Sequence, residues 1–252
     1  MELAKRIVSR AFRTVGYEVT RIAKAALPPD FDAGTREVCE LVRPFTMTSP
    51  ERVFALRHSV QYLLKRGIPG DFVECGVWRG GSMMAVARTM QDSGVTDRNL
   101  YLFDTFEGMS APTQDDVNFN GESAADLLAG SAREANPTAA FSSLDEVKSN
   151  LSSTGYPPER VFFIKGKVEE AIPAQAPAQI ALLRLDTDWY ESTYHELLHL
   201  YPRLSPGGIL VIDDYGHWEG ARKAVDTYFA EHNLKLLLHR IDYTGRICVK
   251  IE

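Results

Sequence analysis

The sequence predicts an α/β fold, with a doubly wound and mostly parallel seven-stranded sheet that ends in an antiparallel hairpin. From Gly67 onward, short apolar runs alternate with stretches of helical periodicity, which is typical of parallel strands joined by helices. The last two runs lie too close together for a helix between them, so we expect them to pair as a hairpin. Several runs are followed directly by acidic residues, at the edge where such sheets bind ligands.

The expected elements follow in order along the chain. An early helical stretch ends near Arg43; Ser49 then provides an N-cap and Pro50 a first helical residue for a helix to about Lys65. Another helix is expected to about Met90, after a glycine-rich turn. The predicted strands span residues 72–75, 100–103, 161–164, 180–185 and 209–212, and the predicted hairpin strands span 234–239 and 246–251.

The chain is expected to divide into N-terminal helices over residues 1–66 and a sheet domain over residues 67–252. Within the first 27 residues, apolar side chains such as Phe12 alternate with basic ones such as Arg10, which is typical of an amphipathic helix. Such a helix packs on its own domain or on a second subunit, or it touches a membrane surface. Packing is the commoner use of the pattern.

The segment over residues 107–141 is long and polar, and only residues 124–129 within it have a helical pattern. Long insertions of this kind inside a compact domain usually cover a site. We therefore expect a lid over the binding site.

Composition excludes several classes of protein. The net charge of -6 leaves no concentrated basic surface for nucleic acid. Three widely spaced cysteines suggest neither a disulfide framework nor a zinc site, and they favour a reducing cytoplasm. No apolar stretch has the length of a transmembrane helix, and no secretory signal is evident. This composition fits a protein that binds a small molecule better than one that binds nucleic acid.

One end of the expected site is suited to a nucleoside. The run from Glu74 through Gly76 and Gly80 to Ser82 reads as a strand, a tight turn and a helix start, where backbone can approach a ligand closely. A carboxylate at Glu74 would face an ammonium group better than a pyrophosphate. Asp104 ends the next strand, where an acid accepts hydrogen bonds from ribose hydroxyls.

These two acids favour S-adenosylmethionine over a nicotinamide dinucleotide, which remains an alternative. Phe106 and Met109 could supply an apolar wall for the adenine. The glycine-rich turn alone is a weak signal, because tight turns also serve strand–helix packing.

The other end of the expected site is acidic. Asp186 and Asp188 follow one predicted strand, and Asp213 and Asp214 follow another. Neighbouring strands would bring these carboxylates close together, where they repel one another unless a proton or a cation intervenes. A hard cation such as Mg²⁺ is the natural ligand of such a cluster, and it lowers the pKa of a bound hydroxyl.

Asp188 is a candidate general base for that hydroxyl, with His195 and His217 as competitors. Aromatic residues beside the acids, such as Trp189 and Trp218, either line an acceptor pocket or belong to the core.

Three long motifs, at residues 70–82, 185–193 and 213–218, resemble the macrocin O-methyltransferase (TylF-like) family, and the likeness runs from about Thr46 to the C-terminus. The resemblance implies a Rossmann-like class I methyltransferase that uses S-adenosylmethionine and Mg²⁺. It also implies a hydroxyl acceptor on a sugar of a glycosylated natural product, and a homo-oligomer built through the N-terminal helices and the lid region.

The resemblance also implies roles for individual residues. By motif position, Asp188 is the general base, Thr46 and Met47 reach over the cofactor, and Val168 and Glu169 lie near the adenine. The metal ligands are Asp186, Asp213 and Asp214, and Asp186 also lies within reach of the cofactor. Two other readings stay open: a catechol or phenol acceptor on the same fold, and a non-catalytic binding module. The non-catalytic reading is disfavoured because the acids after both strands, Asp186, Asp188, Asp213 and Asp214, are all present.

Overall fold

The computed structural model describes residues 27–129 and 140–252. The chain separates into two units, Met1–Phe31 and Asp32–Glu252. In the first unit, residues 27–31 contain a turn in which the Phe31 amide donates to the Pro28 carbonyl at 3.2 Å. The expected amphipathic helix lies almost entirely outside the described residues, as does the 130–139 part of the insertion.

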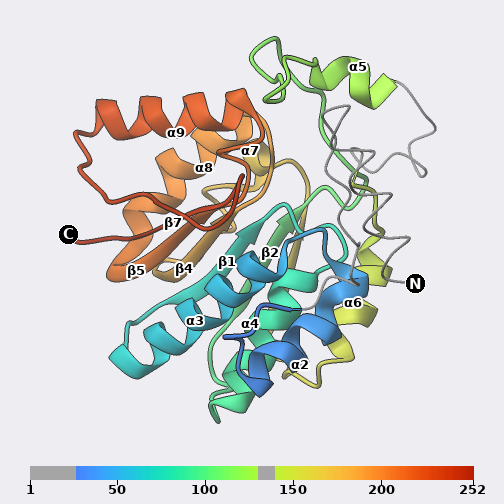
Figure 1. Ribbon diagram of the computed structural model, residues 1–252, viewed down its shortest axis with the longest axis vertical. Coiled ribbons are helices and arrows are strands. Elements are labelled where there is room, and N and C mark those ends of the chain that lie inside the picture. The colour runs from blue at the N-terminus through green and yellow to red at the C-terminus, as the bar shows by residue number, and fades with distance from the viewer. Residues whose placement is uncertain (1–26, 130–139) are drawn as a thin grey trace, which may run out of the picture. The chain divides into compact units, whose positions relative to one another are not determined.

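The second unit is built on a seven-stranded sheet (Figure 1), which confirms the predicted fold class. Its strand order is β3-β2-β1-β4-β5-β7-β6, and the first five strands of that order are parallel. β7 pairs antiparallel with β5 and with β6. The strands are β1 (Asp71–Cys75), β2 (Leu100–Asp104), β3 (Val161–Lys165), β4 (Ile180–Leu185), β5 (Leu204–Ile212), β6 (His239–Arg240) and β7 (Arg246–Val249).

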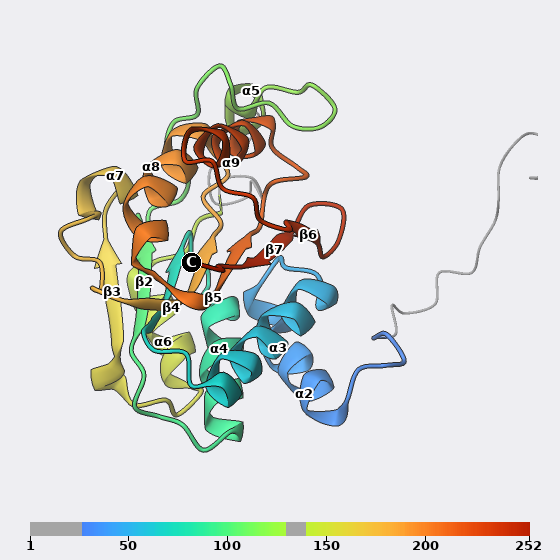
Figure 2. The same cartoon turned by 90° about the vertical axis from the view of Figure 1, so that its left-hand side faces the viewer.

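Helices cover both faces of the sheet (Figure 2). α2, α3, α4 and α6 pack together on one face, and α7, α8 and α9 lie on the other. Among the described helices, none is both long and apolar enough to cross a membrane. The helices are α2 (Ala33–Val42), α3 (Pro50–Arg66), α4 (Gly81–Asp92), α5 (Ala124–Ala129), α6 (Leu144–Ser152), α7 (Val168–Ala171), α8 (Tyr190–Leu200) and α9 (Glu219–Glu231), with 3-10 turns η1 (Arg43–Phe45), η4 (Pro158–Arg160) and η5 (Tyr201–Arg203).

The predicted start of α3 is confirmed. The Ser49 side chain accepts a hydrogen bond from the Arg52 amide, Pro50 is the first helical residue, and Gly67 ends the helix in a left-handed conformation. An N-cap oxygen satisfies an amide that has no partner inside the helix. This cap fixes where the chain enters α3, and therefore where the first turn of α3 meets the site.

The hydrophobic core explains why the central strands read as apolar runs. Every residue of β4 is buried, because helices cover both of its faces. Side chains of β4 such as Leu183 and Leu185 pack with Leu197 of α8 and Tyr228 of α9 in one cluster.

The predicted bounds of the last strands need correction. β5 begins at Leu204 instead of 209, because Leu204 already pairs with Ile180 of β4 and the irregular stretch at Gly207 and Gly208 exchanges two backbone hydrogen bonds with Lys250. β6 contains only His239 and Arg240, so it shares just His239 with the predicted 234–239, since β7 offers it only two residues in register. The leucines before β6 pack partly against the core without forming a strand.

The strand order reverses direction between β1 and β4. From β1 the chain adds β2 and β3 on one side, and it then returns to place β4 and β5 on the other. The two sets of connecting loops diverge at the carboxyl ends of β1 and β4, and this opening is where ligands bind in doubly wound sheets.

Candidate active site

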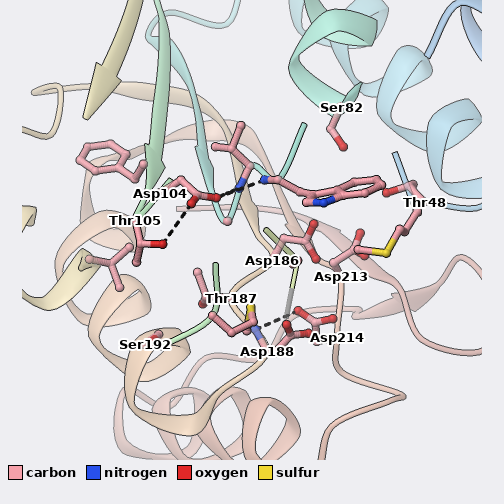
Figure 3. Close-up of a pocket in the computed structure, with 18 of the residues that line it drawn as sticks. Thr48, Ser82, Asp104, Thr105, Asp186, Thr187, Asp188, Ser192, Asp213 and Asp214 are labelled. Carbon is pink, nitrogen blue, oxygen red and sulfur yellow. Dashed lines mark hydrogen bonds between the residues drawn. The ribbon is translucent and has the colours of Figure 1, made fainter. Parts of the chain in front are cut away.

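A cavity of about 350 Å³ opens at the carboxyl ends of the strands. Asp104 lies on its wall at one end, and Asp186, Asp188, Asp213 and Asp214 lie at the other (Figure 3). Loops after β1, β2, β3, β4 and β5 all contribute to the wall. The cavity therefore joins the two ends of the site that the sequence predicted separately.

A tight turn after β1 forms the cofactor end. Gly76 has φ +79°, and a Cβ there would collide with the carbonyl of Asp186. The Asp186 amide donates to the Cys75 carbonyl at 2.9 Å, so the backbones after β1 and β4 touch. Only glycine fits both the conformation and the close approach.

Asp104 ties the turn to the end of β2. Its Oδ2 accepts from the amides of Val77 at 2.6 Å and Trp78 at 3.1 Å, and its Oδ1 accepts from the amide of Phe106 at 2.6 Å. Burial raises the pKa of Asp104, and the three amide donors oppose that rise. Thr105 Oγ1 also donates to Oδ1 at 3.5 Å, so a ligand hydroxyl would compete with this long hydrogen bond for the last of about four acceptor positions on the carboxylate.

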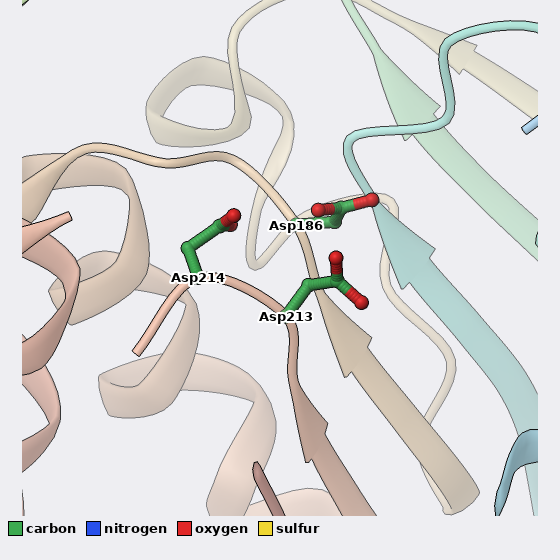
Figure 4. A group of neighbouring side chains, drawn as sticks. All are labelled: Asp186, Asp213 and Asp214. Atoms are coloured by element: carbon green, nitrogen blue, oxygen red, sulfur yellow. The ribbon is translucent and has the colours of Figure 1, made fainter. Parts of the chain in front are cut away.

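Three carboxylates converge at the acidic end (Figure 4). Asp186, Asp213 and Asp214 each offer an oxygen, and these oxygens lie within 4.8 Å of one another. Burial and the neighbouring acids raise the pKa values of Asp186 and Asp214, although Arg184 opposes the rise at Asp186. The oxygens are hard donors in a crowded acidic setting, which is the chemistry that suits a divalent cation.

Asp188 lies beside this cluster. Its amide donates to Oδ2 of Asp214 at 3.2 Å, and the two carboxyl groups also share a hydrogen bond. Removal from water, opposed by that hydrogen bond, raises the pKa of Asp188 to about 7. Its backbone has φ +66°, which non-glycine residues rarely adopt. A carboxylate on a cavity wall whose pKa lies near neutrality is suited to accept a proton.

Two arginines balance the acids. Arg184 in β4 has only 3% of its side chain exposed, and its guanidinium donates to Glu74 at 2.5 Å and to Asp186 and Asp213 at 2.6 Å each. Arg52 in the first turn of α3 pairs with the other oxygen of Asp213 and lies 3.0 Å from Asp242 in the β6–β7 turn. The arginines hold acidic side chains from separate strands in one place.

Most of the predicted site residues line the cavity. They are Thr46, Met47, Gly76, Ser82, Asp104, Val168, Glu169, Asp186, Asp188, Asp213 and Asp214, together with Met109. Glu74, Gly80 and Phe106 lie behind the wall: Glu74 is 1% exposed and bound to Arg184, Gly80 precedes α4, and Phe106 is buried near Phe163. Their predicted contacts with a cofactor stay predictions.

Comparison with known proteins decides the family. The family model for macrocin-O-methyltransferase (TylF) matches residues 5–250. The chain belongs to this family. It is 35% identical over 200 residues to the 8-demethyl-8-(2,3-dimethoxy-alpha-L-rhamnosyl)-tetracenomycin-C 4'-O-methyltransferase of Streptomyces olivaceus, covering 79% of this chain and 73% of that one.

Two further relatives agree. The mycinamicin III 3''-O-methyltransferase of Micromonospora griseorubida is 35% identical over 207 residues, which cover 79% of this chain and 76% of that protein. The solved structure of the O-methyltransferase NovP superposes with a TM-score of 0.72 at 30% identity, over 82% of this chain and 83% of that one. The chain is thus an S-adenosylmethionine-dependent O-methyltransferase.

Two arginines of the site, Arg184 and Arg52, were not predicted from the sequence. Arg184 could have been found, because an arginine inside an otherwise apolar strand is costly to bury without acidic partners. Arg52 gave no such signal, since a basic residue in the first turn of a capped helix is ordinary.

A third missed residue lies behind the loop after β4. Glu196 of α8 is fully buried and accepts a hydrogen bond from Oγ1 of Thr187 at 3.0 Å. Burial raises its pKa well above the usual value, and the Thr187 hydrogen bond opposes the rise. Because Thr187 stands between Asp186 and Asp188, Glu196 supports the loop that carries both acids.

The other predicted candidates, two tryptophans and two histidines, differ in whether they line the cavity. Trp189 and Trp218 are buried against each other with ring centroids 5.0 Å apart and pack under α5, and Trp218 also reaches the cavity wall. His195 donates from Nε2 to the Ile172 carbonyl at 3.0 Å and does not line the cavity, whereas His217 does. Asp188 and His217 thus remain the two candidates for the base.

Proposed function

We propose that this O-methyltransferase methylates a sugar hydroxyl of a glycosylated natural product, and that Asp186, Asp213 and Asp214 hold the Mg²⁺ that the reaction needs. The observation that carries the proposal is the convergence of these three carboxylates at the end of the cavity opposite Asp104. The relatives named above act on a rhamnosylated tetracenomycin and on mycinamicin III, which supports a glycoside as acceptor.

The donor set fits a hard divalent cation. All three groups are carboxylates, and two of them follow β5 while the third follows β4, so rigid neighbouring strands hold them. Arg184 and Arg52 offset part of the negative charge without occupying every oxygen lone pair. Mg²⁺ characteristically takes one or a few carboxylates and keeps the other positions for water and substrate oxygens.

The residues of this chain then have separable tasks. When bound, S-adenosylmethionine supplies the methyl group, and a divalent cation lowers the pKa of a hydroxyl and orients it. Asp104 and the turn at Gly76 hold the cofactor end of the cavity in place. Asp188 accepts the proton that leaves the acceptor hydroxyl at its carboxylate oxygen. Alignment of the acceptor oxygen with the methyl group provides most of the remaining rate enhancement.

The test is a methyl-transfer assay with labelled S-adenosylmethionine against a panel of glycosides and catechols, after chelation and with Mg²⁺ added back. Transfer to a glycoside that stops on chelation and returns with Mg²⁺ is the expected result. Asp214 contacts neither arginine directly, so it is the metal ligand chosen for substitution. Asp214→Asn should abolish the Mg²⁺ response. Asp188→Asn should lower kcat about 10²- to 10⁴-fold.

Asp97→Asn is the matched control, because Asp97 is an exposed acid in the loop before β2. It should leave the rate and the Mg²⁺ response unchanged. Chelator-resistant transfer would contradict the metal assignment, and transfer to catechols alone would contradict the acceptor class.

A further inference from the structure

Three aromatic side chains from distant segments meet beside the acidic end of the cavity. Phe119 belongs to the insertion after β2, His217 to the loop between β5 and α9, and Tyr243 to the turn between β6 and β7. Ring centroids lie 5.3 Å apart for Phe119 and His217, 6.1 Å for Phe119 and Tyr243, and 6.0 Å for His217 and Tyr243, all in edge-to-face arrangements. We call this group the aromatic rim.

The aromatic rim is held to the acid cluster by backbone hydrogen bonds. The Phe119 amide donates to the His217 carbonyl, and the His217 amide donates to the Asp214 carbonyl, both at 2.9 Å. The Gly216 amide donates to the Thr244 carbonyl at 2.9 Å, which fixes the turn that carries Tyr243. The rings therefore keep a set position relative to Asp214.

Two of the three rings are unusually open to solvent. Phe119 is 55% exposed and Tyr243 is 53% exposed, although large apolar side chains favour burial. Tyr243 and His217 line the cavity, while Phe119 does not and continues the rim outward. A rigid ring that keeps part of its surface free, next to a binding cavity, can stack on a flat or apolar group at little entropic cost.

We propose that the aromatic rim binds the apolar or planar aglycone of the acceptor, while the sugar ring that carries the reacting hydroxyl lies against the acids. The inference rests on the proposed function and adds the part of the substrate beyond the sugar. Because Phe119 lies outside the cavity proper, it reaches the group attached to the sugar instead of the sugar itself.

The test compares the 4-nitrophenyl and methyl glycosides of one accepted sugar. The wild type should show a lower KM for the aryl glycoside. An aromatic pair contributes about 0.5–1.5 kcal/mol, so Phe119→Ala and Tyr243→Ala should each raise that KM about twofold to tenfold. The KM for the methyl glycoside should move much less, and Phe119→Tyr should restore the wild-type preference.

Phe162→Ala is the matched control, since Phe162 is a 41% exposed aromatic on β3, the edge strand farthest from β6. It should keep the preference for the aryl glycoside. Equal KM values for both glycosides in the wild type, or equal losses for both in the rim variants, would overturn the role of the rim. Wild-type transfer to catechols alone would instead overturn the proposed function, and this inference with it.

Discussion

Replacing Arg184 by methionine removes the cation at the centre of the site while keeping a long apolar stem. The guanidinium has three carboxylate partners within 2.6 Å, and it also donates to Thr48 at 3.1 Å. Glu74 depends on it most, because Glu74 is 1% exposed and its second oxygen has no hydrogen-bond partner among the described residues. The variant would leave a carboxylate buried without a cation.

The size of the effect follows from that burial. Breaking a buried ion pair by removing one partner costs about 3–5 kcal/mol. Burial already raises the pKa of Glu74 to about 7, with Arg184 opposing the rise, so the variant can take up a proton there instead. We therefore expect Arg184→Met to lower the free energy of unfolding by about 3 kcal/mol at pH 8, near the lower end of that range.

The assay is urea denaturation followed by circular dichroism at pH 8. A second variant, Arg184→Met with Glu74→Gln, should recover a large part of the loss, because it removes the unpaired charge. Arg88→Met is the matched control: Arg88 pairs with Asp92 on the surface at 2.9 Å and should change stability by less than about 1 kcal/mol. An Arg184→Met protein as stable as the control, or no recovery with Glu74→Gln, would refute the reasoning.

Three further predictions follow from the geometry. Asp104→Ala should weaken S-adenosylmethionine binding at least about tenfold in isothermal titration, because the turn after β1 loses two amide contacts, the loop after β2 loses one, and the cofactor loses an acceptor. Wild-type affinity in the variant would contradict this. Glu196 has a raised pKa in the folded state, so the wild type loses stability as pH rises above the unfolded value of about 4.5. Between pH 5 and pH 8, urea denaturation should therefore show Glu196→Gln gaining stability relative to the wild type. If the stability of both proteins changed with pH in the same way, the raised pKa of Glu196 would be contradicted. Gly76→Ala should destabilise the fold by about 1–3 kcal/mol more than Gly94→Ala, because both positions have positive φ but only Gly76 abuts the Asp186 carbonyl; thermal unfolding that shows equal losses would contradict the role of close packing.

Most of the fold was predictable because buried parallel strands leave a plain pattern. β4 is apolar except for Arg184, and its length and flanking turns identify it. The bounds of β6 were not predictable in the same way. The leucines before β6 form a short apolar run like that of a strand, but β7 provides hydrogen-bond partners only for His239 and Arg240.

The acidic end of the site was predictable for a geometric reason. Asp186 and Asp213 each follow a strand, and parallel neighbours end at the same edge of a sheet. The contact of Arg52 with Asp213 joins residues 161 positions apart through the packing of α3 on the sheet, and no local pattern encodes it. The meeting of Phe119 with Tyr243 likewise depends on how the insertion folds back over the β6–β7 turn.

The most direct test of the account is metal binding itself. Mn²⁺, standing in for Mg²⁺, can be titrated into the wild type, Asp214→Asn and Asp97→Asn while the electron paramagnetic resonance signal of the free ion is followed. We predict one site in the wild type and in Asp97→Asn, and an affinity at least about tenfold weaker in Asp214→Asn, as loss of a charged ligand implies. Equal affinity in all three proteins, or no site in the wild type, would contradict the assignment of Asp186, Asp213 and Asp214 as a metal centre.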